Sequence, residues 1–255
     1  MIEALARGLR AGPRPVAVLA GAGVSQTAGV STGQDLLRQA AAARGEDPGA
    51  DPVAWFVDTF GHFPNYFAIV QGGAGDQPTL PRHVFEGMAP TPAHRALAEM
   101  AAHGLLGPFL TTNFDRLLEL ALTESGLTPH VARQLAEMAP APRTGPLVVK
   151  LHGDYLDLRI RDTPSRLHTY HPVVDALLDR VLSGHDLLVC GWSASWDLPL
   201  GAALIRTAGR RRTYWLQCGE PTPRARKIMA VRDALVARVD GSDEGLQALA
   251  RIVAR

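Results

Sequence analysis

Short apolar runs alternate along the chain with longer segments in which apolar residues recur every three or four positions. The apolar runs contain few polar residues, as expected for parallel strands that are covered on both faces. Strands are predicted over residues 16–20, 108–112, 147–151, 186–190, 213–217 and 235–239. This repetition of strand and helix predicts an α/β fold with a doubly wound, mostly parallel, Rossmann-like sheet.

The intervening helical segments carry recognisable start and stop signals. In residues 91–104, Thr91 suits the N-cap, Pro92 the first helical position and Gly104 the stop. Further helices are predicted over residues 33–45, 113–126, 171–184, 197–209, 223–234 and 242–254.

Two segments depart from this alternation of predicted strands and helices. Residues 46–90 combine many aromatic, glycine and proline residues, and we interpret them as a small helical insertion or cap beside the sheet. Residues 154–172 read as irregular chain. Neither segment has the pattern of an independent domain, so one domain is expected over residues 1–255.

Composition narrows the function classes. Of 255 residues, 46% are apolar and 20% charged, and the net charge is +1, as in a soluble globular protein without the basic excess that non-specific nucleic-acid binding requires. The basic run 210–212 precedes a predicted strand, where a solvated strand entry explains it. The first apolar run is too short for a signal peptide and no segment is long enough to span a membrane, which predicts a cytoplasmic protein.

Metal and disulfide chemistry has little support. The chain has two cysteines, Cys190 and Cys218, so a four-cysteine zinc site is impossible and a disulfide framework is not expected. Cys190 lies in an apolar run, which predicts a buried thiol. The pair His168 and His171 has no evident third ligand, and a surface loop explains it better than a metal site.

The carboxyl ends of the strands are where an open α/β sheet binds ligands. After the first strand, Gly21 and Gly23 form a turn whose backbone amides suit a pyrophosphate. The third glycine of the dinucleotide fingerprint is replaced by Gln26, so a tight turn without ligand remains an alternative.

Polar residues also follow the next two strands. Asn113 and Asp115 lie in "TTNFD", where a helix N-cap explains one of them but not both. An amide and a carboxylate together suit the hydroxyls and carboxamide of a nucleotide-like ligand. In "KLHG", His152 follows directly on the apolar run. It is either a hydrogen-bonded loop residue or a group that transfers a proton in a ligand cleft.

The segment "GWSAS" imitates the nucleophile elbow of α/β-hydrolases, with Ser193 directly after a strand. That fold needs a histidine after the serine, whereas the last histidine here is His185. Ser195 also replaces the second glycine of the elbow. The α/β-hydrolase interpretation is therefore rejected.

Taken in order, "GAGVS", "TTNFD", "KLHG" and "GWS…D" resemble the sirtuin family over about Val16 to Asp197. The resemblance is greatest to the sirtuin-like domains of bacterial anti-phage defence proteins. It implies NAD-binding residues at Gly21, Ala22, Gly23, Ser25, Thr112, Asn113, Asp115, Gly191, Trp192 and Ser193. It also implies that Asn113 and Asp115 flank the nicotinamide ribose and carboxamide, with His152 as general base; these three are the candidate catalytic residues.

The departures from the family refine this expectation. Sirtuin deacylases carry a four-cysteine zinc ribbon after the histidine motif, whereas residues 154–172 contain no cysteine. They also have Asp-Phe-Arg after the glycine loop, where this chain has "STGQDL". We therefore expect an NAD hydrolase that uses NAD as its substrate and no metal. The alternatives are an NAD-dependent protein deacylase and a non-catalytic module that binds NAD or ADP-ribose.

An unregulated NAD hydrolase would deplete the NAD of its own cell, so its activity is expected to be controlled. The resembling defence proteins carry a sensing segment or act with a partner, and their family makes a homo-oligomer plausible. The chain ends directly after its last helical pattern, so the expectation is a fragment or one subunit of a two-protein system.

Overall fold

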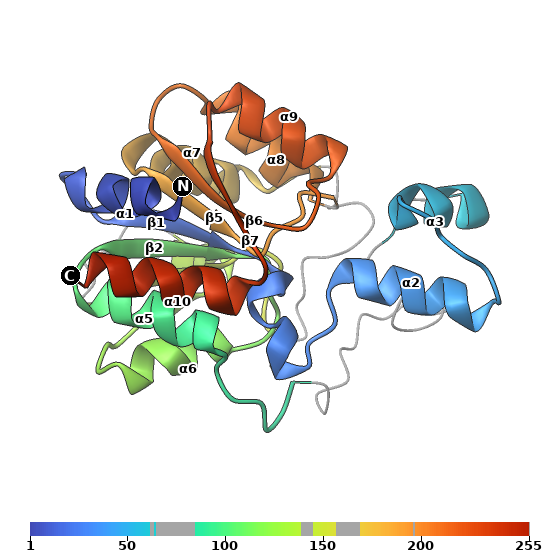
Figure 1. The fold of residues 1–255 in the computed structure, drawn as a ribbon, viewed down its shortest axis with the longest axis horizontal. Coiled ribbons are helices and arrows are strands. Elements are labelled where there is room, and N and C mark those ends of the chain that lie inside the picture. Colours follow the sequence, from blue (N-terminus) through green and yellow to red (C-terminus); the bar gives the residue numbers. More distant parts are fainter. Residues whose placement is uncertain (62–63, 65–84, 139–144, 157–168, 196, 255) are drawn as a thin grey trace.

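The computed structural model describes residues 1–61, 64, 85–138, 145–156, 169–195 and 197–254. Its centre is one seven-stranded sheet in which all neighbouring strands run parallel (Figure 1). In spatial order the strands are β3 (His130–Ala132), β4 (Leu147–Lys150), β2 (Leu106–Thr111), β1 (Val16–Ala20), β5 (Leu187–Cys190), β6 (Thr213–Cys218) and β7 (Leu235–Val239). The predicted doubly wound α/β fold is confirmed.

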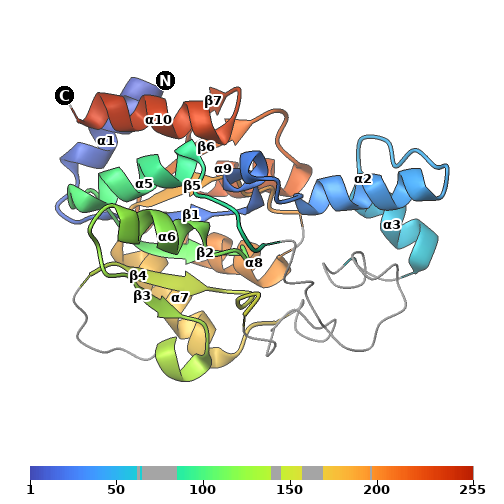
Figure 2. The same cartoon turned by 90° about the horizontal axis from the view of Figure 1, so that it is seen from below.

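Helices cover both faces of the sheet (Figures 1 and 2). One face carries α1 (Ile2–Ala11), α5 (Pro92–Ala102), α6 (Leu117–Glu124) and α10 (Ser242–Val253). The other face carries α7 (Pro172–Gly184), α8 (Leu198–Arg206) and α9 (Pro223–Val231). The remaining helices are α2 (Gly33–Ala43), α3 (Pro52–Phe60) and the short 3₁₀ turns η1 (Ala22–Val24), η2 (Gln26–Ala28) and η4 (Leu135–Met138).

Strand β1 shows why its sequence is apolar throughout. All five of its residues are buried, and successive side chains point to opposite faces of the sheet. Val16, Val18 and Ala20 pack under α1, α5 and α10, whereas Ala17 and Leu19 pack under α7 and α8. Burying a valine or leucine side chain stabilises a fold by roughly 1.5–3 kcal/mol. The central strand therefore contributes to two cores at once.

The helix boundaries follow their caps. Helix α5 has the predicted N-cap Thr91, whose side chain accepts from the backbone N–H of His94, and Gly104 has the left-handed φ of +72° after its end. Helix α6 begins at Leu117 rather than at residue 113, because Asp115 Oδ1 accepts a hydrogen bond from Leu117 N at 3.0 Å. The residues between β2 and α6 therefore form a loop.

Helix α1 and strand β3 were not predicted from the sequence. Helix α1 precedes the first predicted strand, and β3 is a three-residue strand at the sheet edge that pairs with β4. The sequence of β3 is too short to give a strand pattern, since a periodicity needs four or more residues.

Helices α2 and α3 lie side by side, to one side of the sheet (Figures 1 and 2). Helix α3 lies within the predicted insertion 46–90, and Asp51 caps its start by accepting from Val53 N and Ala54 N. The rest of that prediction falls largely on residues 62–63 and 65–84, outside the described residues. Most of the predicted irregular stretch 154–172 also lies outside them, at residues 157–168.

Within the described residues, every helix is too short or too polar to cross a membrane.

Candidate functional site

The site forms where the winding of the sheet reverses. From β1 the chain continues to β2 on one side, while β5 lies on the other side, so the loops after β1 and β5 meet at a topological switch point. Gly21 N donates to Cys190 O at 3.0 Å, and Gly23 N donates to Gly191 O at 2.9 Å. These bonds hold the two loops backbone to backbone.

This close approach explains the glycines. A Cβ added to Gly23 would lie 2.8 Å from Gly191 Cα, and one added to Gly191 would lie 2.6 Å from Val24 N. Gly191 also has a φ of +62°, which side chains rarely adopt. The motif "GAG" is therefore required by loop packing, and it brings backbone close to whatever occupies the adjoining cavity.

A cavity of about 1000 Å³ opens beside these loops, at the carboxyl ends of the strands. Most of the residues proposed from the sequence line it, namely Ala22, Gly23, Thr112, Asn113, Asp115, His152, Gly191, Trp192 and Ser193. Gly21 and Ser25 do not line it, and Ser25 is fully buried. Loops after four different strands thus meet at one cavity, as the strand-end argument predicted.

Ser25 connects the polar residues of the cavity wall. Its Oγ donates to Asp115 Oδ2 at 2.8 Å and accepts from Asn113 Nδ2 at 3.0 Å. Asn113 Nδ2 also donates to Gly21 O at 3.2 Å. The serine therefore fixes the orientations of the amide and the carboxylate from behind the cavity.

His94 completes this arrangement from α5. Its Nδ1 accepts from Thr91 N at 3.2 Å, which places the proton of a neutral ring on Nε2, 3.3 Å from Ser25 Oγ. Burial lowers the pKa of His94, against the opposing effect of the nearby Asp115 carboxylate. Ser25 then accepts two hydrogen bonds and donates one, so its hydroxyl has a single consistent orientation.

One atom of Asn113 has no partner among the residues that the structure describes. Its Nδ2 makes both of its hydrogen bonds, whereas its buried Oδ1 has no hydrogen-bond partner in the described part of the chain. A buried acceptor left unsatisfied costs about 1–3 kcal/mol. Because Asn113 lines the cavity, a hydroxyl or N–H donor of a bound ligand would satisfy this atom.

His152 lines the same cavity, and its ring contacts the carboxylate of Asp197. Its Nε2 lies 2.7 Å from Asp197 Oδ2, and Tyr170 Oη donates to the same oxygen. The other oxygen of Asp197 accepts from Leu200 N at 2.8 Å and so caps α8. Because α8 holds the carboxylate in place, the imidazole orientation is fixed as well. This side chain is one-fifth exposed, at 18%.

The cysteine and histidine residues considered for thiol and metal chemistry have other roles in the structure. Cys190 is buried, as expected, and burial raises the pKa of its thiol to about 12. His171 caps α7 by accepting from Val173 N at 3.3 Å, whereas His168 lies outside the described residues. No group of three or more metal-ligating side chains occurs among the residues that the structure describes.

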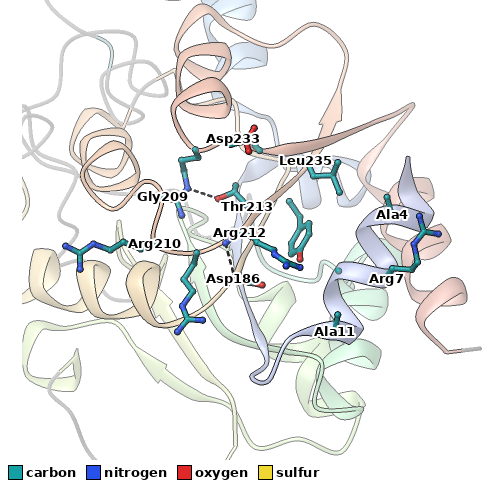
Figure 3. Close-up of a pocket in the computed structure, with 15 residues that line it drawn as sticks. Ala4, Arg7, Ala11, Asp186, Gly209, Arg210, Arg212, Thr213, Asp233 and Leu235 are labelled. Carbon is teal, nitrogen blue, oxygen red and sulfur yellow. Dashed lines mark hydrogen bonds between the residues drawn. The ribbon is translucent and has the colours of Figure 1, made fainter.

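A second cavity of about 870 Å³ lies at the opposite ends of strands β5, β6 and β7 (Figure 3). It contains none of the residues proposed from the sequence. Arg212 N donates to Asp186 Oδ1 there at 3.1 Å, and Arg210 and Arg212 are exposed, as a solvated strand entry predicts. Arg7 and Arg210 point in different directions and do not converge on one ligand position (Figure 3).

Residues 108–229 match the family model of the SIR2-like domain. This part of the chain is similar to the SIR2-like domain. The matched part contains Asn113, Asp115, His152 and Ser193, whereas the glycine loop after β1 precedes it.

Solved structures show the same fold. A mutant Sir2 homologue in complex with ADP-ribose is 19% identical with a TM-score of 0.57, and the match covers 100% of this chain and 97% of that one. A Sir2 homologue in complex with NAD is 18% identical with a TM-score of 0.54, covering 99% of this chain and 93% of that one. No curated protein sequence matches the chain.

Several residues of the candidate site were missed from the sequence. Asp197 was noted as the end of a motif but given no role, and His94 and Tyr170 were not singled out. A weak signal existed for His94, since Thr91 and His94 occupy the two positions of a capping box in which glutamate is usual at the second. Nothing in the sequence indicates that Tyr170 reaches Asp197.

Proposed function

We propose that the protein is an NAD hydrolase that releases nicotinamide and ADP-ribose. The observation that supports this most strongly is the meeting of two groups at one cavity. The unsatisfied Oδ1 of Asn113 and the His152–Asp197 pair both face the space beside the glycine loop. A module that only binds NAD has no need of a histidine oriented by a carboxylate.

In the proposed reaction, the bond between C1′ of the ribose and the nicotinamide nitrogen breaks, and nicotinamide leaves as a neutral molecule with the bonding electron pair. Positive charge then develops on the ribose. Asn113 Oδ1 accepts a hydrogen bond from a ribose hydroxyl or from the attacking water. Asp115, held by Ser25, orients the carboxamide, and its negative charge lies close to the developing positive charge.

Water then adds to C1′, and His152 takes its proton. With Nε2 donating to Asp197, Nδ1 is the acceptor nitrogen of the neutral ring. The Asp197 carboxylate stabilises the imidazolium that forms and holds the ring in one tautomer, as the acid of a catalytic triad does. A positioned general base contributes typically about 10²–10⁴-fold to a rate.

The rest of the cavity suits the remainder of NAD. We assign the pyrophosphate to the glycine loop at Ala22 and Gly23, which lines the cavity with small residues. Gly191, Trp192 and Ser193 are assigned to the adenosine half, and Thr112 to the wall beside Asn113. Gly21 and Ser25 act from behind this wall by holding the residues that touch NAD.

Hydrolysis is favoured over deacylation by the chemistry that the chain lacks. Two cysteines cannot form the four-cysteine zinc module that accompanies the acyl-lysine tunnel in sirtuin deacylases. We therefore infer that water is the nucleophile at C1′. The proposed role is depletion of cellular NAD in bacterial anti-phage defence, with a partner or sensor supplying the trigger, and it rests on the sequence resemblance.

The test is incubation of the purified protein with NAD, with and without an acetylated peptide, and identification of products by chromatography. Hydrolysis predicts equal amounts of nicotinamide and ADP-ribose at the same rate in both reactions. Nicotinamide release that requires the peptide, with an acetylated ADP-ribose product, would instead show a deacylase. Stoichiometric binding without product would show a binding module.

A further inference from the structure

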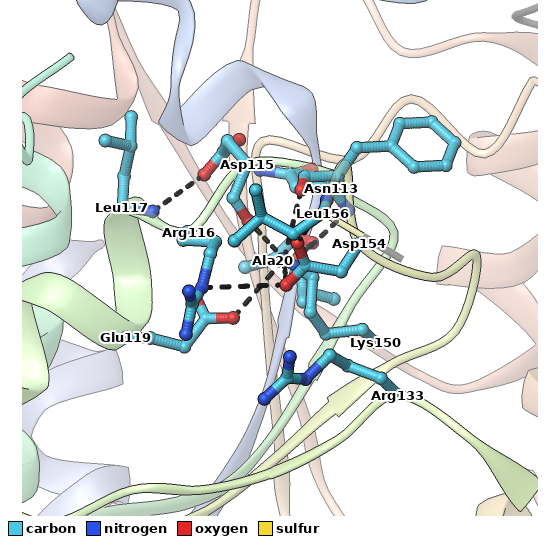
Figure 4. Close-up of polar contacts among 12 residues, drawn as sticks. Ala20, Asn113, Asp115, Arg116, Leu117, Glu119, Arg133, Lys150, Asp154 and Leu156 are labelled. Atoms are coloured by element: carbon cyan, nitrogen blue, oxygen red, sulfur yellow. Dashed lines mark hydrogen bonds and ion pairs between the residues drawn. The ribbon is translucent and has the colours of Figure 1, made fainter. Parts of the chain in front are cut away.

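A lysine lies fully buried directly behind the site. Lys150 ends strand β4, two residues before His152, and its side chain has no exposed surface. A buried ammonium group is costly unless it is paired and hydrogen-bonded. Figure 4 shows the residues that surround it.

The ammonium group of Lys150 bonds to backbone as well as to acids. Nζ donates to Phe114 O at 3.2 Å and to Asp115 O. Glu119 Oε1 lies 3.3 Å from Nζ, and Asp154 Oδ2 lies 3.5 Å from it. The two acceptor carbonyls belong to the loop that carries the proposed catalytic residues.

The charges around Lys150 balance. Arg116 Nε lies 3.7 Å from Asp154 Oδ2, so two positive and two negative side chains form one group (Figure 4). Of the four, Arg116 is the most exposed, with 35% of its side chain accessible, and the two acids are buried. Removing Lys150 alone would leave two buried carboxylates without their main counter-ion.

This group joins two loops of the site to each other. Phe114 O, which accepts from Lys150 Nζ, also accepts a hydrogen bond from Tyr155 N at 3.1 Å. Tyr155 belongs to the loop that follows His152. Asp154 lies in the same loop, and its other oxygen accepts from Leu156 N at 3.0 Å. These hydrogen bonds and ion pairs therefore connect the loop after β2 to the loop after β4 behind the cavity.

We propose that Lys150 is a positioning residue that sets the distance and orientation of Asn113 and Asp115 relative to His152. This inference rests on the proposed NAD hydrolysis. Stability alone does not account for the group, because replacing a buried charge cluster by apolar residues of similar volume is often neutral or stabilising. The ammonium group instead fixes two backbone carbonyls, Phe114 O and Asp115 O. Both lie in the loop between β2 and α6, outside any strand or helix.

The test separates positioning from stability with two variants. Lys150→Met alone leaves Glu119 buried without its ion pair and Asp154 with only Arg116, at 3.7 Å, so its unfolding midpoint falls well below that of the wild type. The triple variant Lys150→Met, Glu119→Leu, Asp154→Asn removes those charges, and the asparagine still accepts from Leu156 N. Its unfolding midpoint returns towards the wild-type value, but its kcat stays about tenfold or more below wild type. Glu119→Gln, which keeps Lys150 on both carbonyls, is the matched control and retains a kcat close to wild type.

Hydrogen exchange gives a second readout that does not depend on turnover. In the triple variant, exchange over residues 112–116 and 152–156 accelerates about tenfold or more, while exchange in β1 and β5 is unchanged. If the wild type proves inactive on NAD, the proposed function fails, and the exchange pattern still decides whether Lys150 connects the loops. Wild-type kcat or unchanged loop exchange in a folded triple variant would overturn the inference.

Discussion

His152 Nε2 lies 2.7 Å from Asp197 Oδ2, although 45 residues separate the two in the chain. Asp197 is buried, and its second oxygen caps α8. One side chain therefore both starts a helix and orients the proposed general base. This double use allows the two roles to be separated by mutation.

Asp197→Asn should lower the rate of NAD hydrolysis about a hundredfold or more while leaving stability nearly unchanged. Asparagine is as good an N-cap as aspartate, but while its single oxygen accepts from Leu200 N, its Nδ2 faces His152 Nε2 and cannot accept from it. The amide also has no charge to stabilise an imidazolium. The measurement is kcat together with urea unfolding. Asp197→Ala, the companion variant, should in addition lose about 1 kcal/mol of stability with the cap. An Asp197→Asn protein as active as the wild type would refute the role of the pair.

The sequence and the structure agree where local pattern decides the outcome. The apolar run Val16–Ala20 forms β1, and the signals at Thr91 and Pro92 place the start of α5 correctly. Most of the residues proposed at the strand ends, all except Gly21 and Ser25, also line one cavity, because parallel strands send their carboxyl ends to a common edge.

Contacts between distant segments could not be predicted in this way. His94 reaches Ser25 across 69 residues, and Asp197 meets His152 only because α8 starts beside the loop after β4. Strand β3 has three residues and no detectable period. Hydrogen bonds of this kind depend on how helices pack on the sheet, and no spacing in a single sequence records that.

Stability should depend on pH through His94. Burial lowers the pKa of His94 below its ordinary value of 6.5, so between these two values the unfolded chain binds a proton that the folded protein does not. The contribution to the free energy of unfolding is full above pH 6.5. It falls as the pH drops below that value, by at most about 1.4 kcal/mol per pH unit for one proton.

Urea unfolding of the wild type and of His94→Gln at about pH 7.5 and about pH 5.5 measures this dependence. The wild type should lose more stability between the two conditions than the variant, which lacks the titrating group. Equal losses in the two proteins would show that His94 is not buried as a neutral ring.

Gly23→Ala should destabilise the protein by about 1–3 kcal/mol, because the new Cβ meets the backbone of Gly191 at 2.8 Å. It should also weaken binding of ADP-ribose, since the glycine loop forms the proposed pyrophosphate site. Urea unfolding and calorimetric titration measure the two effects.

Gly184→Ala is the matched control for that substitution. Gly184 ends α7, and no described residue elsewhere in the fold has an atom within 4 Å of the added Cβ, so the same change should leave both stability and binding intact. Equal behaviour of the two variants would contradict the account of the loop packing.

Cys218 offers a probe of the cavity that does not depend on catalysis. It is exposed and lines the cavity, whereas Cys190 is buried with its pKa raised to about 12. The thiol of Cys218 is partly desolvated although the residue is exposed, which raises its pKa, so alkylation by iodoacetamide should be slow and confined to this residue. Saturating ADP-ribose should slow it further, as followed by mass spectrometry with Cys218→Ser as the blank. Labelling that ADP-ribose does not affect would place the ligand elsewhere.

The most direct test of the central claim compares wild type and His152→Ala side by side with NAD as the sole substrate. The wild type should convert NAD to equal amounts of nicotinamide and ADP-ribose. His152→Ala, folded by circular dichroism, should leave NAD intact over the same period. NAD loss at the wild-type rate in the folded variant, or intact NAD with both proteins, would contradict the account.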